Sequence, residues 1–314
     1  MARQVVQILA GQGVAVALLH GGDRWDHGVM SSDIDLLVDR PLSEFADRFF
    51  HTLDLAGSLP IVVWNYDVGA TSVFVVDRDC DRAVQLDLNY DRDGTGRHGL
   101  RSGAVLQRAR SDGTLARIDD VDEWLYSLRK RLVKRQHERV RDLFATRPTE
   151  ARELTSRAAE IFAPHAASVV CAAIEADEIP RWRPSPPRPA SYAGRVRRAV
   201  ARVAQPIGFW VDLRGAPADV MRASAHIEER VARILPAVEV LGRTSTRQVW
   251  SIPQAVLARL KPRLVVSSGL RRPLAPVDLV LTVDPDLGRV TRTLVRAMAA
   301  RNAAVSGRDR AAEH

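Results

Sequence analysis

An α/β fold in two parts, joined by a helical segment, is what this 314-residue sequence predicts. Three observations predict it. Short apolar runs typical of buried strands alternate with helical stretches in both halves of the chain. Hydrophobic residues make up 46% of the sequence, which is enough for a core in each half. A stretch with five prolines, residues 179–192, separates the halves and indicates a semi-rigid linker, because proline cannot continue a helix.

The first hundred residues are expected to form an α/β unit with a mixed sheet. Apolar runs predict its strands at 13–20, 33–38, 60–66, 71–76 and 83–90, and helical spacing predicts helices at 2–11 and 42–56. The polar stretch from Asp77 to Arg82 indicates a hairpin turn between the last two strands. This unit is expected to span residues 1–100 as a domain of its own.

Residues 101–178 are expected to form a helical extension, with helices at 103–110, 120–145, 149–163 and 165–177. After the linker, residues 193–305 alternate strands at 209–213, 238–242, 263–268 and 277–283 with helices near 217–235, 253–260 and 287–303. That alternation predicts a second α/β domain with a partly parallel sheet, and the linker suggests that it folds independently. Residues 306–314 are expected to be a disordered tail.

Charge is unevenly spread along the chain, whose net charge is +8. Residues 1–100 hold 8 Lys and Arg against 15 Asp and Glu, whereas residues 151–314 hold 26 against 15. The basic part could attract nucleotides or nucleic acid by its long-range field. It could equally be a solvated Arg-rich surface. Nucleic acid is not the favoured partner, because the basic residues are scattered and aromatic residues are only 5% of the chain.

Several classes of protein are not favoured by the composition. The two cysteines, Cys80 and Cys171, lack the spacing of a disulfide framework or a zinc site, which fits a reducing, cytoplasmic location. The first residues lack the features of a signal peptide. Since no apolar run approaches the roughly 18 residues that span a bilayer, no membrane partner is expected.

The segment with most chemical information is LLHGGDRWDHGVMSSDIDLLVD, residues 18–39. An apolar strand ends at Gly21-Gly22, and such a turn offers free backbone N–H groups to a phosphate. Asp33 and Asp35 open the next strand and point to the same face, because side chains alternate along a strand. Two carboxylates so close together repel each other unless a cation lies between them, and Mg²⁺ prefers such oxygen ligands.

A third carboxylate, Asp87, lies within the apolar strand Val84-Gln85-Leu86-Asp87-Leu88. An acid embedded in such a strand is costly unless it is paired or bound to metal. Asp87 could complete a two-metal site, or it could be a surface acid on an edge strand. Asp81 and Asp91 are poorer candidates because they are expected in turns.

Together these residues resemble the nucleotidyltransferase superfamily related to DNA polymerase β. The resemblance rests on Gly21-Gly22, on Asp33-Ile34-Asp35-Leu36 and on Leu86-Asp87-Leu88, and it covers roughly residues 10–100. His20 stands where an apolar residue is usual, and it is expected only to cap the strand end. The resemblance implies that two Mg²⁺ ions, or Mn²⁺ in their place, bind at Asp33, Asp35 and Asp87. It implies in-line transfer of a nucleotide from an NTP to a hydroxyl, with release of pyrophosphate.

A narrower resemblance extends to residues 99–135 and to the C-terminal half. It is to a bacterial group of such proteins associated with a thymidylate-kinase-like half. Lys130 and Lys134 share a helix face and could reach the triphosphate, or they could belong to an ordinary solvated face. The loop at 212–219 lacks the Lys and hydroxyl of a kinase phosphate loop, so the resemblance implies a P-loop kinase fold without the kinase chemistry.

Three functions therefore remain open from the sequence. The leading one is nucleotide transfer to a small molecule or glycan-related acceptor, whose identity the sequence does not give. A second is transfer onto RNA or protein, as toxin-like members of the superfamily do. The third is a non-catalytic nucleotide-binding or scaffold protein, although nothing structural requires three acids at these positions.

Overall fold

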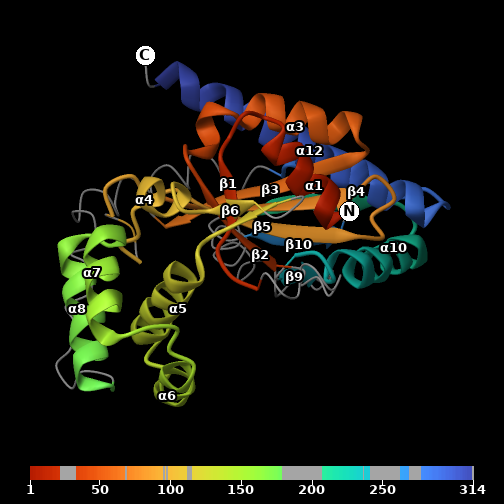
Figure 1. The fold of residues 1–314 in the computed structure, drawn as a ribbon. Coiled ribbons are helices and arrows are strands. Elements are labelled where there is room, and N and C mark those ends of the chain that lie inside the picture. The colour runs from red at the N-terminus through yellow and green to blue at the C-terminus, as the bar shows by residue number, and fades with distance from the viewer. Residues whose placement is uncertain are drawn as a thin grey trace.

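The computed structural model describes residues 1–21, 33–67, 69–94, 96, 98–111, 115–178, 207–235, 237–240, 262–268 and 277–312. Gly22, the expected linker at 179–192 and the expected helix at 253–260 lie outside the described residues. The fold is mixed α/β, with two sheets and a group of helices that projects to one side (Figure 1).

The larger sheet is mixed and has the strand order β3-β4-β5-β2-β1-β7-β6. Its strands are β1 (Val16–Leu18), β2 (Asp33–Val38), β3 (Ser58–Asp67), β4 (Ala70–Asp77), β5 (Ala83–Asn89), β6 (Arg110–Ser111) and β7 (Ala116–Arg117). β2 runs parallel to β5 and antiparallel to β1, and the β3–β4–β5 meander is antiparallel. The expected strands in the first hundred residues are thus all present.

One face of this sheet is covered by α1 (Ala2–Ala10) and α3 (Ala46–Leu55), which follows the short 3-10 helix η1 (Leu42–Glu44) (Figure 1). Ile34 and Leu36 of β2 and Leu86 of β5 point into this core together with the apolar residues of both helices. The alternation of β2 therefore sends Asp33 and Asp35 to the opposite face, where Leu37 joins a different core.

Five helices form the extension: α4 (Ser102–Leu106), α5 (Asp120–Lys134), α6 (His137–Ala145), α7 (Ala151–Ile161) and α8 (Pro164–Ala176). Their shared core includes Ala17 and Leu19 beside β1, so the helices are packed on the Asp33/Asp35 face. The single helix expected at 120–145 is wrong. Arg135 adopts the left-handed conformation, with φ 54°, which ends α5 and starts α6 in a new direction.

The second sheet is parallel, with the order β11-β8-β10-β9. Its strands are β8 (Phe209–Arg214), β9 (Ala237–Val240), β10 (Arg263–Ser268) and β11 (Leu279–Thr282), accompanied by α10 (Pro217–Val231) and α12 (Leu287–Ala312). α12 is longer than the helix expected at 287–303, and it extends into the segment expected to be a disordered tail. The sequence there is rich in Ala and Arg, both strong helix formers.

The two halves share one hydrophobic core, in contrast to the independent folding suggested by the linker. Leu59, Ile61 and Val62 of β3 belong to the same buried cluster as the apolar residues of β8, β10 and α12. Asn302 Nδ2 of α12 donates to the Pro60 carbonyl at 3.3 Å, and Arg230 of α10 pairs with Asp81. Within the described chain, no helix is both long and apolar enough to cross a membrane.

Candidate active site

Three aspartates meet on the face of the larger sheet that the helical extension packs against. β2 and β5 are parallel neighbours, and their register sets Asp35 directly opposite Asp87 and Asp33 opposite Gln85. One ligand oxygen from each of Asp33, Asp35 and Asp87 lies within 4.8 Å of the other two. The expected convergence of these three carboxylates is therefore present in the structure.

The row of facing residues continues across the sheet from Asp87 to Ser72 of β4 and to Trp64 of β3. Asp87 Oδ1 accepts hydrogen bonds from the Ser72 hydroxyl and from Gln85 Nε2, the latter at 3.0 Å. Its second oxygen, Oδ2, accepts no hydrogen bond from the described residues. Two neutral donors thus fix the orientation of the Asp87 side chain and leave one oxygen available.

The electrostatic environment suits a cation. Burial raises the pKa of Asp33, and the neighbouring charges of Asp87 and Asp35 raise it further. Burial also raises the pKa of Asp87, although its hydrogen bonds from Gln85 and Ser72 oppose that effect. Such shifts mean that negative charge is crowded here, and a divalent cation would relieve the crowding.

The carboxylates line a cleft of about 270 Å³. Its walls come from the sheet, from the segment after β5 and from α5. Besides the three aspartates, the lining residues are Leu37, Trp64, Tyr66, Gly69, Ala70, Ser72, Gln85, Asn89, Asp91, Gly96, His98, Leu100, Ser102, Tyr126, Lys130 and Lys134. The aromatic and neutral polar residues lie mainly on β3, β4 and β5, whereas the two lysines come from α5.

α5 supplies charged groups to the aspartates and to the glycine turn. Lys130 Nζ lies 2.8 Å from Asp35 Oδ2, and His20 Nε2 lies 2.5 Å from the same oxygen. In the first turn of α5, Glu123 Oε1 accepts a hydrogen bond from the Gly21 backbone N–H at 3.1 Å. Burial pushes up the pKa of Asp35, but the hydrogen bonds from His20 and Lys130 outweigh it and hold the pKa well below its usual value.

Tyr126 forms the floor between these contacts. Its ring is 2% exposed and stacks against His20 with the centroids 6.4 Å apart. Lys130 Nζ lies 5.7 Å from the centroid of the same ring, within the range of a cation–π contact. Both of the side chains that contact Asp35 therefore also pack against Tyr126.

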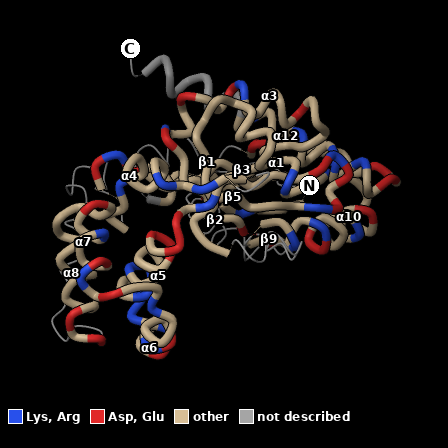
Figure 2. The backbone as a smooth tube through the Cα atoms, in the orientation of Figure 1, with Lys and Arg blue, Asp and Glu red and all other residues tan. Residues whose placement is uncertain are grey.

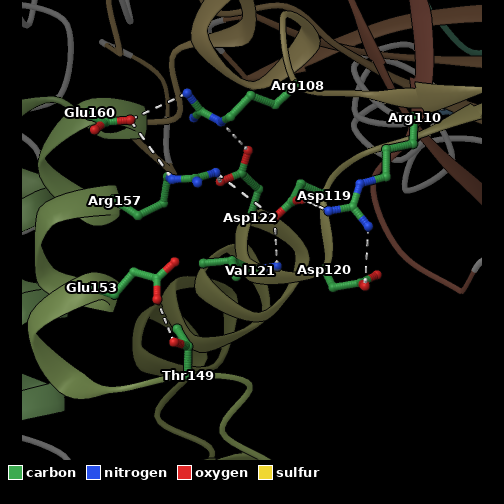
Figure 3. Close-up of polar contacts among 10 residues, drawn as sticks. All are labelled: Arg108, Arg110, Asp119, Asp120, Val121, Asp122, Thr149, Glu153, Arg157 and Glu160. Atoms are coloured by element: carbon green, nitrogen blue, oxygen red, sulfur yellow. Dashed lines mark hydrogen bonds and ion pairs between the residues drawn. The ribbon is translucent and has the colours of Figure 1, made fainter.

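A polar network at the start of α5 sets the position of this helix (Figure 3). Asp119 caps it, with its carboxylate accepting the Val121 backbone N–H at 3.0 Å. Asp122, which is fully buried, lies between Arg108 at 3.2 Å and Arg157 of α7 at 3.3 Å. The network joins the start of α5 to α7 and to the segment that follows α4.

The charges along α5 are ordered, with acids in the first turn and bases near the end (Figure 2). This order complements the helix dipole, whose positive pole is at the N-terminus. The acidic Glu123 therefore comes next to Gly21, and the basic Lys130 and Lys134 come next to the cleft.

No family model, curated protein or solved structure matches this chain. What the site can bind is therefore inferred from its own residues. Three carboxylates on rigid strands form a donor set of hard oxygens, which can hold a divalent cation. Hard oxygen donors of this kind suit Mg²⁺ or Mn²⁺ by their chemistry.

The predicted nucleotide-binding residues, two glycines and two lysines, differ in the partners that they have in the structure. Gly21 adopts φ 80°, the left-handed region that favours glycine, and its N–H already has a carboxylate partner; Gly22 is outside the described residues. Lys134 lines the cleft as expected and has no ion pair among the described residues, whereas Lys130 pairs with Asp35.

Sequence reasoning missed several residues of the cleft. His20 is more than a strand cap, because it contacts Asp35, and Asp91 lines the cleft although it was set aside as a turn residue. Trp64 and Tyr66 carried a signal, since they interrupt an apolar strand with polar-tipped aromatic rings. Asp35 and Lys130 are 95 residues apart in the sequence, and no local pattern indicates that they are in contact.

Proposed function

We propose that the chain is a divalent-metal-dependent nucleotidyltransferase that transfers NMP from an NTP to a hydroxyl of a small molecule or glycan-related acceptor. The convergence of Asp33, Asp35 and Asp87 in one cleft carries the proposal. It agrees with the resemblance of the Gly-Gly and Asp-Ile-Asp segments to the polymerase-β-like superfamily.

In this proposal Asp33, Asp35 and Asp87 hold Mg²⁺ ions. When bound, the ions neutralise the triphosphate and favour ionisation of the acceptor hydroxyl. Gln85 and Ser72 hold Oδ1 of Asp87, so the carboxylate that would bind a metal ion has little rotational freedom. Such fixed orientation is what brings reacting groups into line at low entropic cost.

The lysines of α5 supply positive charge for the triphosphate. Lys134 is exposed at the cleft and has no carboxylate partner in the described chain, so its ammonium is available to a phosphate. The opposite wall, formed by Trp64, Tyr66, Ser72 and Asn89, has no basic residue. We therefore assign the nucleotide to the α5 side and the acceptor to the β3–β5 side.

The C-terminal half is proposed to have no kinase activity. The loop between β8 and α10, Gly215 and Ala216, has neither a Lys nor a hydroxyl, both of which a phosphate loop needs. The C-terminal half shares a hydrophobic core with β3, which supports a packing role instead. Trp64, on the cleft wall, packs against that core.

The test uses each of the four NTPs labelled at the α-phosphate, with Mg²⁺ and cell extract separated into small-molecule, RNA and protein fractions. We expect the α-label on a small-molecule acceptor, the γ-label released only as pyrophosphate, and loss of transfer in Asp35→Asn. Asp39→Asn is the matched control, because Asp39 follows the same strand but pairs with Arg40 outside the cleft.

Each other outcome selects a different function. Label in RNA or protein would replace the small-molecule acceptor with a macromolecular one. Binding of NTP without transfer to any fraction would instead favour a non-catalytic nucleotide-binding protein. Label from γ-labelled NTP onto dTMP, persisting in Asp35→Asn, would show a kinase in the C-terminal half.

A further inference from the structure

α5 contacts the site with two side chains of opposite charge, Lys130 and Glu123. Lys130 places an ammonium on Asp35 Oδ2 at 2.8 Å, and Glu123 places a carboxylate on the Gly21 N–H at 3.1 Å. Asp35 belongs to the carboxylate cluster that suits a cation, and Gly21 belongs to the turn that suits a phosphate. Lys130 therefore occupies a position that suits a cation, and Glu123 occupies a position that suits an anion.

The contact at Asp35 is crowded. Its Oδ2 has two partners, His20 Nε2 and Lys130 Nζ, which themselves lie 3.0 Å apart. A divalent cation bound at the same carboxylate would repel the Lys130 ammonium at hydrogen-bonding distance. A cation at Oδ2 and the Lys130 ammonium therefore compete for the same carboxylate oxygen.

A displaced Lys130 has a destination within the cleft. It shares a helix face with Lys134 and is only partly buried, with 26% of its side chain exposed, so its long side chain can rotate toward the cleft. A triphosphate there would attract both ammonium groups. The same anion would compete with Glu123 for the Gly21 N–H, because both are oxygen acceptors for one donor.

We propose that Lys130 and Glu123 act as internal substitutes for the metal and the phosphate, so that the ligands must displace them. The inference rests on the proposed function and deepens it by assigning a binding role to α5. Metal alone binds weakly, because it must break the Lys130–Asp35 ion pair without compensation. Metal and triphosphate together bind well, since the released ammonium finds a new anion. By linkage, each ligand then strengthens the other equally.

The test measures Mn²⁺ binding without nucleotide, by titration calorimetry and by the loss of the free-ion electron paramagnetic resonance signal. Lys130→Met removes the internal competitor but keeps a long side chain against Tyr126. We expect it to bind Mn²⁺ about 10-fold more tightly than the wild type, within the usual range of coupling between sites. Lys134→Met is the matched control, because it removes the same charge from the same helix face without touching Asp35.

The second arm measures binding of inorganic tripolyphosphate with Mg²⁺. Glu123→Gln keeps the shape and the hydrogen-bond acceptor but removes the charge, so we expect binding several-fold tighter than in the wild type. Asp120→Asn removes one negative charge from the same turn, but Asp120 is exposed and lies near Arg110 instead of Gly21. It should leave tripolyphosphate binding close to the wild-type value.

The outcomes separate this inference from the proposed function. If Asp35→Asn abolishes Mn²⁺ binding but Lys130→Met binds no more tightly than the wild type, the metal site stands and the substitution by Lys130 is wrong. An equal gain in Lys134→Met would also overturn it, because general charge would then explain the effect. If no variant binds Mn²⁺ while circular dichroism shows all of them folded, both proposals fail.

Discussion

Replacing Ile61 by Ala tests whether the core that β3 shares with the C-terminal half stabilises that half. Ile61 is fully buried in β3 and belongs to the core that β3 shares with β8, β10 and α12. The substitution removes three carbons. At about 0.8 kcal/mol for each buried methylene, the transfer cost is about 2.4 kcal/mol. The cavity left behind raises the total to about 3 kcal/mol, within the measured range for such substitutions.

The assay is native-state hydrogen exchange followed by mass spectrometry. If the shared core links the halves, Ile61→Ala lowers the opening free energy of β8, β10 and α12 by about the same 3 kcal/mol. Exchange in those segments then becomes roughly 100-fold faster, since each 1.4 kcal/mol is a factor of ten.

The matched control is Leu9→Ala in α1. Leu9 is equally buried and the same size, but it belongs to the core between α1, α3 and the sheet. It should speed exchange most in α1 and α3 and have a smaller effect on β8 and β10. Faster exchange confined to the first-sheet strands in Ile61→Ala would refute the reasoning, because the C-terminal half would then be stable alone.

Three further predictions concern single groups. Without metal, Asp35→Asn should lower the midpoint of urea unfolding by a constant amount between pH 7 and 5. The difference in midpoint between wild type and variant, the gap, should shrink below about pH 4. A carboxylate with a depressed folded pKa stabilises the fold above its usual pKa and loses that effect as pH falls; an equal gap at pH 3 would contradict this. Burial raises the pKa of Cys80 to about 11, so at pH 8 Ellman's reagent should label the partly exposed Cys171 first and Cys80 only on unfolding, as mass spectrometry would detect. Asp119→Ala removes the cap of α5 and should cost about 1 kcal/mol, or roughly 2 °C in Tm by calorimetry; an unchanged Tm would show that the cap contributes nothing.

Local patterns predicted the elements that build the aspartate cluster. The strand expected at 33–38 has the same bounds as β2, because apolar and polar residues alternate there and one face is buried. The convergence of Asp33 with Asp35 followed from that alternation alone. The position of Asp87 beside them needed the further assumption that its strand is a neighbour, and the parallel β2–β5 register meets that assumption.

Contacts between distant segments were beyond the same reasoning. The apolar run Pro60-Ile61-Val62-Val63 predicted a strand, but nothing in it indicated α12 as its partner. The break at Arg135 had no Gly or Pro to mark it, and an Arg gives no sequence signal for a left-handed conformation. The ion pair from Lys130 to Asp35 depends on the angle of α5, which no periodicity encodes.

The contact between α12 and β3 has a consequence for synthesis on the ribosome. β3 is an edge strand of the first sheet, and the helix that packs on it comes more than 200 residues later. At about 5–20 residues per second, the strand waits roughly 10–50 seconds for its cover. During that interval a nascent chain whose first sheet has formed presents Leu59, Ile61 and Val62 and an unpaired backbone edge to other chains. We therefore expect a chaperone to bind the N-terminal half of the nascent chain until α12 emerges.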